Sequence, residues 1–418
     1  MTKLLAIALS LTALLGGLPV NPAVRPEAAP VESVDLMASV TARSHPDAVP
    51  AGEVPAAAAD FAVRLLQAGM SGEENTLLSP LSVLCALSMT ANGADGDTLS
   101  QMEAVLGMPV EELNTALRSW SAALPAEEAC RLELANAIWF TDDPRFTVSQ
   151  DFLQTNADWY GAGAYRSPFD QGTCGEINAW VQEHTDGMID GILDSIPEDA
   201  VMYLVNALAF DGQWAKTYEA HQLREGQFTA ADGRVLPAEL MWSVEKRFLQ
   251  DEKAVGFVKP YEGGRYGFAA LLPEEGVSLT DYAASLTGEK LTAMLEEAQE
   301  VKVNAALPKF TSDYKTELSE ALAGMGMPLA FDRDLADFSR LGSWENGNLS
   351  IDKVLHRTHI SVDEQGTEAA ASTAVGMVRT TAAIVEETKE VILDRPFLYL
   401  IVDLETNVPV FIGTVNEL

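Results

Sequence analysis

The sequence predicts an α+β fold with large, mostly antiparallel sheets, and two observations carry this prediction. Helical spacing of apolar residues is concentrated in the first half of the 418-residue chain, whereas strand-like apolar runs dominate after residue 200. A chain that groups its helices and strands in this way does not form alternating βαβ units. No internal repeat and no second linker interrupts this order, so we expect one folded domain.

Residues 1–20 are typical of a signal peptide. Lys3 supplies a positive charge, and residues 4–15 form an apolar run that is too short to span a membrane. Residues 21–55 are rich in Pro and Ala, a composition that disfavours helix and sheet and predicts a flexible leader. We therefore expect a secreted, extracellular protein without a membrane span, whose folded domain covers residues 56–418.

Helices are expected where apolar residues recur every three or four positions. Ser79 followed by Pro80 is typical of the capped start of a buried helix that continues to residue 91. The other expected helices cover 60–68, 98–107, 110–123, 149–159 and 175–185. Strands are expected at 202–210, 248–257, 267–272, 300–307, 359–362, 397–403 and 408–415.

Composition excludes several classes of partner and site. The formal net charge of -35 argues against a nucleic-acid partner, because phosphate binding needs clustered Lys and Arg. The three cysteines are widely spaced and form no CxxC pair, which argues against a disulfide framework. Cys85 lies in an apolar run and is interpreted as a small buried hydrophobic residue. The sequence leaves open one bridge among Cys85, Cys130 and Cys174.

Motifs that would indicate an enzyme are missing from the sequence. It contains no HExxH, no GxSxG and no GxxxxGK[ST] pattern. His184 and His356 stand in patterned segments without a partnered nucleophile, so we interpret both first as structural histidines. The sequence therefore indicates a protein that is not an enzyme and that needs neither a cofactor nor a metal.

The segment after Val362 has an unusual combination of properties. Residues 363–366 predict a turn, and small residues follow it; when they are sorted by the strand period of two, the face that begins with Thr367 carries no charge. Proline is absent between Gly366 and Pro396, so the segment could enter the middle of a sheet. Its small side chains bury little apolar area, and we expect it to lie exposed as a loop.

A loop of this kind stores free energy if it can become a central strand. If about a dozen residues form a hydrogen-bond ladder with a neighbouring strand on each side, they could release on the order of ten kcal/mol of free energy, after the cost of ordering the chain is subtracted. Composition alone favours an Ala/Thr-rich surface linker. The motifs around the segment decide against that alternative.

These motifs follow one another from residue 75 to residue 398, and together they resemble the serpin family. They are NTLLSPLS at 75–82, INAWVQEHTDG at 177–187, LVNALAFDGQW at 204–214, LPKF at 307–310, VLH at 354–356, EQGTEAAA at 364–371 and RPFL at 395–398. The resemblance covers about residues 60–418. Asp211, where the family usually has Lys, and Asn407, where it usually has Gly, are minor departures.

The resemblance implies a fold of three β-sheets and about nine helices, with an exposed reactive-centre loop over about residues 364–394. In this family a target serine protease cleaves the loop, which inserts as a strand into the main sheet and traps the acyl-enzyme. The implied function is suicide inhibition. The alternative is a non-inhibitory serpin that acts as a binding or carrier protein. We expect a monomer, although loop exchange between copies could produce polymers.

The resemblance also assigns candidate site residues. Inhibitory members have an uncharged residue at the position of Thr367 and small residues after it, a pattern that this chain matches. The hinge then comprises Glu364, Gly366, Thr367, Glu368, Ala369, Ala370, Ala371 and Ser372. Ser79, Ser82, Asn206 and His356 match the shutter region beneath the opening strands, and Trp214 matches the top of the opening sheet.

The position of the scissile bond depends on the length of the hinge. The usual spacing from Glu364 places it at Thr380-Thr381, whereas a hinge one residue shorter places it at Arg379-Thr380. Arg379 would fit the acidic specificity pocket of a trypsin-like protease. Thr380 would suit the small apolar pocket of an elastase- or subtilisin-like protease.

Overall fold

The structure is a computed structural model that describes residues 33–43, 54–70, 72, 74–122, 126–127, 130–197, 200–345, 347–367 and 388–418. Within these residues the chain forms nine α-helices and three β-sheets, which confirms the expected α+β fold. The helices are α1 (Val54–Gly69), α2 (Pro80–Ala91), α3 (Gly96–Leu106), α4 (Val110–Ala122), α5 (Gln150–Tyr160), α6 (Gln171–Glu183), α7 (Leu279–Ser285), α8 (Gly288–Glu296) and α9 (Ser319–Met325).

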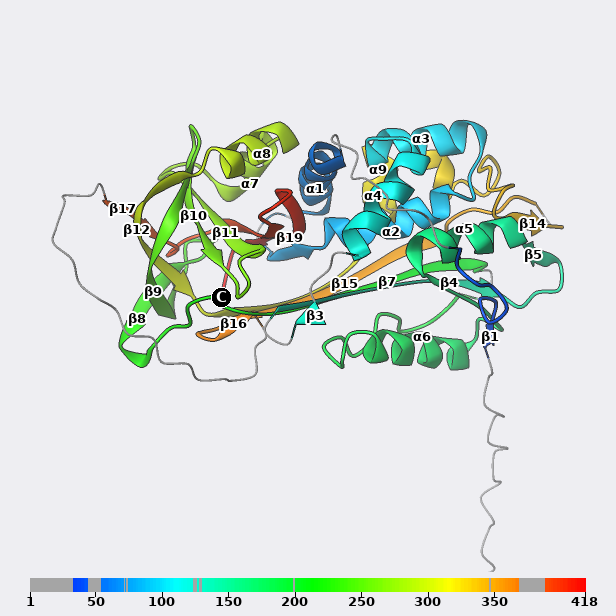
Figure 1. Ribbon diagram of the computed structural model, residues 1–418, viewed down its shortest axis with the longest axis horizontal. Helices are drawn as coiled ribbons and strands as arrows, with labels where there is room; N and C mark the ends of the chain where they lie inside the picture. The colour runs from blue at the N-terminus through cyan, green and yellow to red at the C-terminus, as the bar shows by residue number, and fades with distance from the viewer. Residues whose placement is uncertain are drawn as a thin grey trace, which may run out of the picture.

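The central sheet contains eight strands. In spatial order these are β1 (Val34–Asp35), β6 (Gly163–Ser167), β4 (Cys130–Thr141), β7 (Met202–Gln213), β16 (Gly366–Thr367), β15 (Lys353–Val362) and β13 (Phe310–Glu317), with β3 (Ala126–Glu127) paired to β4. Its middle strands β4, β7 and β15 run through most of the length of the molecule (Figure 1).

The second sheet contains nine strands. Their order is β17 (Thr388–Ile392), β12 (Gln299–Pro308), β9 (Val235–Gln250), β10 (Ala254–Pro260), β11 (Tyr266–Pro273), β18 (Phe397–Asp403), β19 (Val408–Val415) and β2 (Thr76–Leu78), with β8 (Leu223–Thr229) paired to β9. The third sheet consists of β5 (Phe146–Val148) and β14 (Gly342–Trp344).

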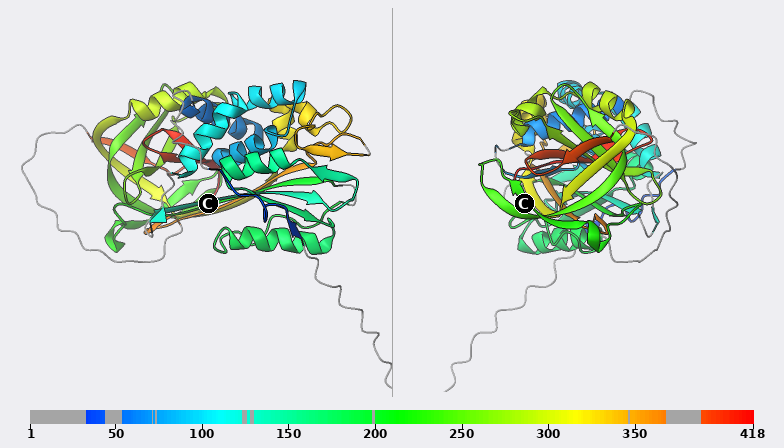
Figure 2. Two further views of the ribbon diagram at one scale, coloured as in Figure 1. Left: turned by 45° about the vertical axis from the view of Figure 1, so that its right-hand side comes forward. Right: turned by 90° about the vertical axis from the view of Figure 1, so that its left-hand side faces the viewer.

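The central sheet is covered on both faces. Helices α2, α4 and α5 lie on one face, and α6 lies alone on the other (Figures 1 and 2). The α6 face has its own core, in which Ile177 and Val181 belong to the same buried cluster as Trp139 of β4 and Tyr203 of β7. Burial on both faces accounts for the continuous apolar runs at 137–140 of β4 and 202–205 of β7.

Part of the predicted flexible leader is folded. Val34 and Asp35 pair with β6, and the N–H of Arg43 donates to Oδ1 of Asp158 at 2.7 Å. The prediction of a flexible leader over residues 21–55 is therefore wrong for residues 33–43. The reason is that the edge strand β6 offers unpaired backbone groups, which a short segment of almost any composition can pair with. The predicted signal peptide at 1–20 lies outside the described residues.

One predicted strand is two strands. The run 248–257 was expected to be continuous, but the chain reverses at Asp251, whose Oδ1 accepts hydrogen bonds from the N–H groups of Lys253 and Ala254, both at 2.7 Å. The carboxylate stabilises a tight turn that joins β9 to β10. The apolar residues on both sides of this turn belong to neighbouring antiparallel strands.

The cysteine and histidine interpretations are confirmed where the structure tests them. Cys85, Cys130 and Cys174 are all buried and none of them forms a disulfide bond, and burial raises the pKa of the Cys85 thiol to about 12. The ring of His184 stacks on Trp180 with centroids 4.1 Å apart, as expected of a structural histidine. No helix in the described part of the chain is long and apolar enough to cross a membrane.

Candidate functional site

A seam between β7 and β15 divides the central sheet. At one end, here called the α6 end, residues 203–205 and 353–355 pair directly and in parallel. At the other, the hinge end, Gly366 and Thr367 of β16 both pair with β7, and Thr367 also pairs with Val362 of β15. Between the two ends, β7 and β15 do not pair with each other or with another strand across the seam within the described residues. The seam therefore offers a place for a further strand that continues from Thr367.

Close packing at the hinge end explains why the sequence has Gly366 and Thr367 there. A Cβ atom on Gly366 would lie 2.1 Å from the carbonyl oxygen of Gly212, so only glycine fits. The side chain of Thr367 is buried, with the residue only 1% exposed, and its hydroxyl shares a hydrogen bond of 2.6 Å with that of Tyr261. A charged side chain at this position would be buried without a partner.

The turn before these residues is closed by its own polar groups. Oδ1 of Asp363 accepts hydrogen bonds from the N–H groups of Gln365 and Gly366, at 2.7 and 3.1 Å. Nζ of Lys309 lies 2.7 Å from a carboxylate oxygen of Glu364 and 2.8 Å from one of Glu239. The hydrogen bond from Lys309 holds the pKa of Glu364 below its usual value. The predicted turn at 363–366 is thus confirmed, and Lys309, which lies between β12 and β13, links it to Glu239 of β9.

The segment that follows β7 clamps this turn from the other side. The backbone N–H of Trp214 donates to the carbonyl oxygen of Gln365, its indole Nε1 donates to that of Asp363, and the N–H of Tyr218 donates to that of Glu364, each at 2.9 Å. Three consecutive carbonyl groups of the turn are therefore satisfied by two residues. Trp214 is 1% exposed and stacks on Tyr261 with ring centroids 4.6 Å apart.

The four predicted shutter residues lie where the direct pairing of β7 and β15 ends. Asn206 and His356 each follow the last paired residue of their strand. The N–H of Ser79 donates to Nε2 of His356 at 3.1 Å, and Oγ of Ser79 accepts from the N–H of Ser82 at 3.3 Å, which caps α2 as predicted. Asn206 bonds to Asn136 of β4 instead.

The hydrogen bond between Ser79 and His356 requires a neutral imidazole. An N–H donor needs the lone pair on Nε2, which a proton would occupy. His356 is 2% exposed, and burial lowers its pKa from 6.5 to about 4. The histidine is therefore neutral over the whole physiological range and holds the start of α2 against β15.

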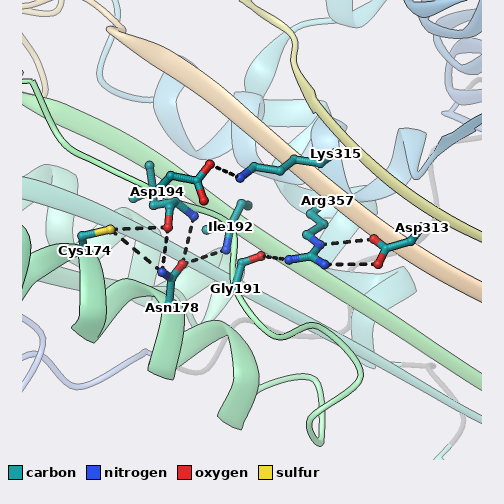
Figure 3. A network of polar contacts seen from close by, with 9 residues as sticks. Cys174, Asn178, Gly191, Ile192, Asp194, Asp313, Lys315 and Arg357 are labelled. Carbon is teal, nitrogen blue, oxygen red and sulfur yellow. Dashed lines mark hydrogen bonds and ion pairs between the residues drawn. The ribbon is translucent and has the colours of Figure 1, made fainter.

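At the α6 end, the segment after α6 crosses the seam (Figure 3). Asn178 of α6 fixes this segment: its Oδ1 accepts from the N–H groups of Ile192 and Leu193 at 2.7 and 2.9 Å, and its Nδ2 donates to the carbonyl oxygen of Leu193 at 2.7 Å. Asp194 then pairs with Lys315 of β13 at 2.6 Å. The segment thereby joins α6, which packs on β7, to a strand beyond the seam.

A second contact reaches the seam strand itself. Arg357 of β15 donates to the carbonyl oxygen of Gly191, and its guanidinium also forms two hydrogen bonds of 3.3 and 3.2 Å with the carboxylate of Asp313 (Figure 3). We call these contacts of Gly191 and Asp194 with β15 and β13 the α6 clasp. Sequence reasoning did not identify it, although Asn178 lies within one of the motifs that carry the resemblance.

Several predicted site residues lie outside the described residues. These are Glu368, Ala369, Ala370, Ala371 and Ser372 of the hinge and Arg379, Thr380 and Thr381 at the predicted scissile bond. The loop was expected to end near residue 394, but Thr388–Ile392 forms β17 and pairs in parallel with β12. The predicted range of about 364–394 therefore includes a strand near its C-terminal end, and the loop ends before Thr388.

Comparisons with known proteins agree on one family. The family model described as "Serpin (serine protease inhibitor)" matches residues 56–418. An uncharacterised serpin-like protein of Thermococcus kodakarensis is 32% identical over 347 residues, which cover 81% of this chain and 80% of that protein.

Solved structures give the same result. The thermophilic serpin tengpin in its native state has a TM-score of 0.89 and 42% identity, covering 93% of this chain and 100% of tengpin. The latent state of tengpin gives a TM-score of 0.76 at 40% identity, with 90% of this chain and 99% of tengpin covered. Thyroxine-binding globulin in complex with thyroxine, at 23% identity, a TM-score of 0.76 and coverages of 87% and 99%, shares the fold.

Proposed function

Because this chain belongs to the serpin family, whose members are usually protease inhibitors and not enzymes, we propose that it is a secreted suicide inhibitor of serine proteases. In this proposal a protease cleaves the segment after Thr367. The segment then inserts as a strand between β7 and β15 before the acyl-enzyme is hydrolysed. Insertion carries the attached protease away and distorts its active site.

The hinge end of the seam is the observation that carries the proposal. Gly366 and Thr367 are already paired with β7, Thr367 is also paired with β15, and the stretches of β7 and β15 beyond it have no partner across the seam in the described residues. An inserting strand would therefore extend an existing ladder, which avoids the cost of starting a new one. The uncharged side chain of Thr367 and the small residues after it in the sequence suit burial in this place.

The similarity to tengpin supports the same starting point. The chain resembles the native state of tengpin more closely than the latent state, in agreement with a conformation that precedes insertion. The scissile bond remains the one proposed from the sequence, Thr380-Thr381 or Arg379-Thr380. Arg379 would direct the inhibitor to trypsin-like proteases, and Thr380 would direct it to elastase- or subtilisin-like proteases.

The alternative is a serpin that binds or carries another molecule without trapping proteases. Thyroxine-binding globulin shows that a complex with a small ligand is compatible with this fold. Its identity to this chain is 23%, so the likeness concerns the fold alone. A non-inhibitory member has no need of an uncharged hinge, and the side chain of Thr367 therefore favours inhibition.

The proposal is tested by mixing the protein with trypsin, elastase and subtilisin in turn, followed by denaturing electrophoresis and mass spectrometry. We expect a covalent band of the combined size with at least one protease. We also expect a released C-terminal peptide that begins at Thr380 or Thr381, which identifies the residue that the protease reads.

A protease whose active-site serine has been chemically blocked is the matched control and should give no covalent band. If every active protease retains its activity and produces only cleaved chain, the inhibitor proposal is wrong. The binding or carrier role then becomes the better account.

A further inference from the structure

A buried lysine lies directly behind the segment that clamps the hinge turn. The side chain of Lys259, at the end of β10, is 2% exposed, and its Nζ lies 3.2 Å from Oε1 of Glu245. Oγ of Ser243 donates to the same oxygen at 2.6 Å and so orients the carboxylate. Burial lowers the pKa of Lys259, and the attraction of Glu245 partly offsets this effect.

The ammonium group touches the clamping segment at three points. Nζ donates to the carbonyl oxygen of Lys216 at 3.1 Å. It also lies 4.2 Å from the ring centroid of Tyr218 and 5.2 Å from that of Trp214. At these distances a cation attracts the faces of aromatic rings. One charge therefore fixes both residues that donate to the hinge turn, together with the carbonyl group between them.

Burying an ion pair costs free energy, because both charges lose their hydration. Well-packed apolar residues of similar volume are usually as stable or more stable, because they avoid the loss of hydration of two charges. The arrangement of Lys259 is understandable if its directional contacts are needed. Those contacts lead through Trp214 and Tyr218 to the carbonyl groups of residues 363–365.

We propose that Lys259 is a positioning residue for loop insertion, acting through Trp214 and Tyr218 on the turn that precedes Thr367. This inference rests on the proposed inhibitory function. With the turn fixed, Gly366 and Thr367 keep their rows in the sheet and the cleaved segment adds to them directly. Without the ammonium group, these rows must form again while the acyl-enzyme is already being hydrolysed, and more of the inhibitor is consumed as a substrate.

The direct test is Lys259→Met, which keeps much of the side-chain volume and removes the charge. The amides of Trp214 and Tyr218 should exchange with solvent deuterium about tenfold faster, because their acceptors lie in the hinge turn. Amides of the β4–β7 ladder in the same sample are the internal reference. The number of inhibitor molecules consumed per protease trapped should rise severalfold.

Lys290→Met is the matched control. Nζ of Lys290 also donates to a backbone carbonyl oxygen, that of Ser285, at 3.1 Å, but it lies at the surface on α8. This variant should leave both the exchange rates and the stoichiometry of trapping at their original values.

A second pair of variants keeps the test decisive if Lys259→Met does not fold. Tyr218→Leu removes a ring that the ammonium group faces, whereas Tyr218→Phe retains it. Exchange at the amide of residue 218 should rise in the first variant and stay close to the original rate in the second.

Two results would overturn the inference. One is exchange at residues 214 and 218 that rises no more than in the β4–β7 reference, since Lys259 would then be a purely structural pair. The other is faster exchange with unchanged stoichiometry of trapping. If the unaltered protein traps no protease, the proposed function fails, and the exchange experiment still decides whether Lys259 holds the clamp.

Discussion

The two ends of the seam are closed by different chemistry. At the hinge end most contacts are buried: Thr367 and Trp214 are each 1% exposed, and backbone carbonyl groups accept most of the hydrogen bonds, while the ion pairs of Lys309 are partly exposed. At the α6 end the clasp depends on charged side chains, among which Asp194 is 89% exposed and Lys315 is 43% exposed. Buried hydrogen bonds are costly to break and depend little on salt, whereas exposed ion pairs contribute little and are screened.

This difference indicates that the two ends of the seam have different roles in loop insertion. The hinge end holds the first rows of the inserting strand in a fixed geometry, where one misplaced group should change the outcome of the reaction. The α6 clasp crosses the rows that the strand must reach later, and its weak contacts could be displaced at little cost. We expect substitutions at the hinge end to change whether a protease is trapped, and substitutions in the clasp to change how easily the seam opens.

The largest effect is expected for Thr367→Arg. The guanidinium group would have to enter the sheet next to Gly212 and Tyr261, where it loses its hydration. The variant should be cleaved as a substrate without forming a covalent complex, as seen by denaturing electrophoresis. Thr367→Ser, which keeps the hydroxyl for Tyr261, is the control and should still trap. Undiminished trapping by the arginine variant would contradict insertion at this seam.

The next largest effect concerns His356, which lies between the two ends of the seam and should make the free energy of unfolding depend on pH. His356 has a pKa of about 4 when folded and 6.5 as its ordinary value, so the unfolded chain binds a proton more readily. Its contribution to the free energy of unfolding is complete above pH 6.5 and is lost as the pH falls towards 4. The total loss is about 3 kcal/mol. Denaturant unfolding between pH 7 and pH 4 measures it.

His356→Phe should remove this part of the pH dependence, at the cost of the hydrogen bond from Ser79. Substitution of His221, whose side chain is 75% exposed, is the control and should leave the dependence intact. An identical pH profile for the original protein and the His356 variant would mean that this histidine is not the group that titrates.

The sequence predicted the parts of this comparison that depend on local chemistry. The cap at Ser79 and the turn at 363–366 follow from residue types that act on their own backbone within a few positions. The family motifs also placed His356 and Trp214 in the candidate site, and the structure brings both to the seam. The segment that starts at Thr367 was predicted to be an exposed loop, which is wrong for Thr367 itself, because the structure buries this residue in β16; its uncharged side chain suits that burial.

The parts that depend on distant segments could not be predicted. Lys259 stands in a strand, where a lysine normally faces solvent; its burial depends on Glu245, Trp214 and Tyr218, which come from two other segments. Arg357 and Lys315 stand among polar residues in their strands, and no nearby residue in the sequence indicates that they contact the segment after α6. Strand β4 was also missed, although charged and apolar residues alternate in its sequence over 130–134.

The smallest effects are expected in the α6 clasp, and they should differ within it. Arg357 is 22% exposed on its side chain and joins Gly191 to Asp313, so Arg357→Gln should lower the free energy of unfolding by about 1 kcal/mol. The Asp194–Lys315 pair is far more exposed, and Asp194→Asn should change the denaturation midpoint by an amount close to the error of the measurement. Urea unfolding at low salt measures both.

High salt and the rate of spontaneous inactivation separate the clasp from the hinge end. Raising the ionic strength to about 1 M shortens the screening length to about 3 Å, so the Arg357→Gln variant and the original protein should become more alike. Prolonged incubation at elevated temperature should inactivate Arg357→Gln faster, because the seam opens more readily without the contact to Gly191. If the arginine variant keeps its activity as long as Asp194→Asn does, the clasp does not restrain the seam, and the hinge end alone controls insertion.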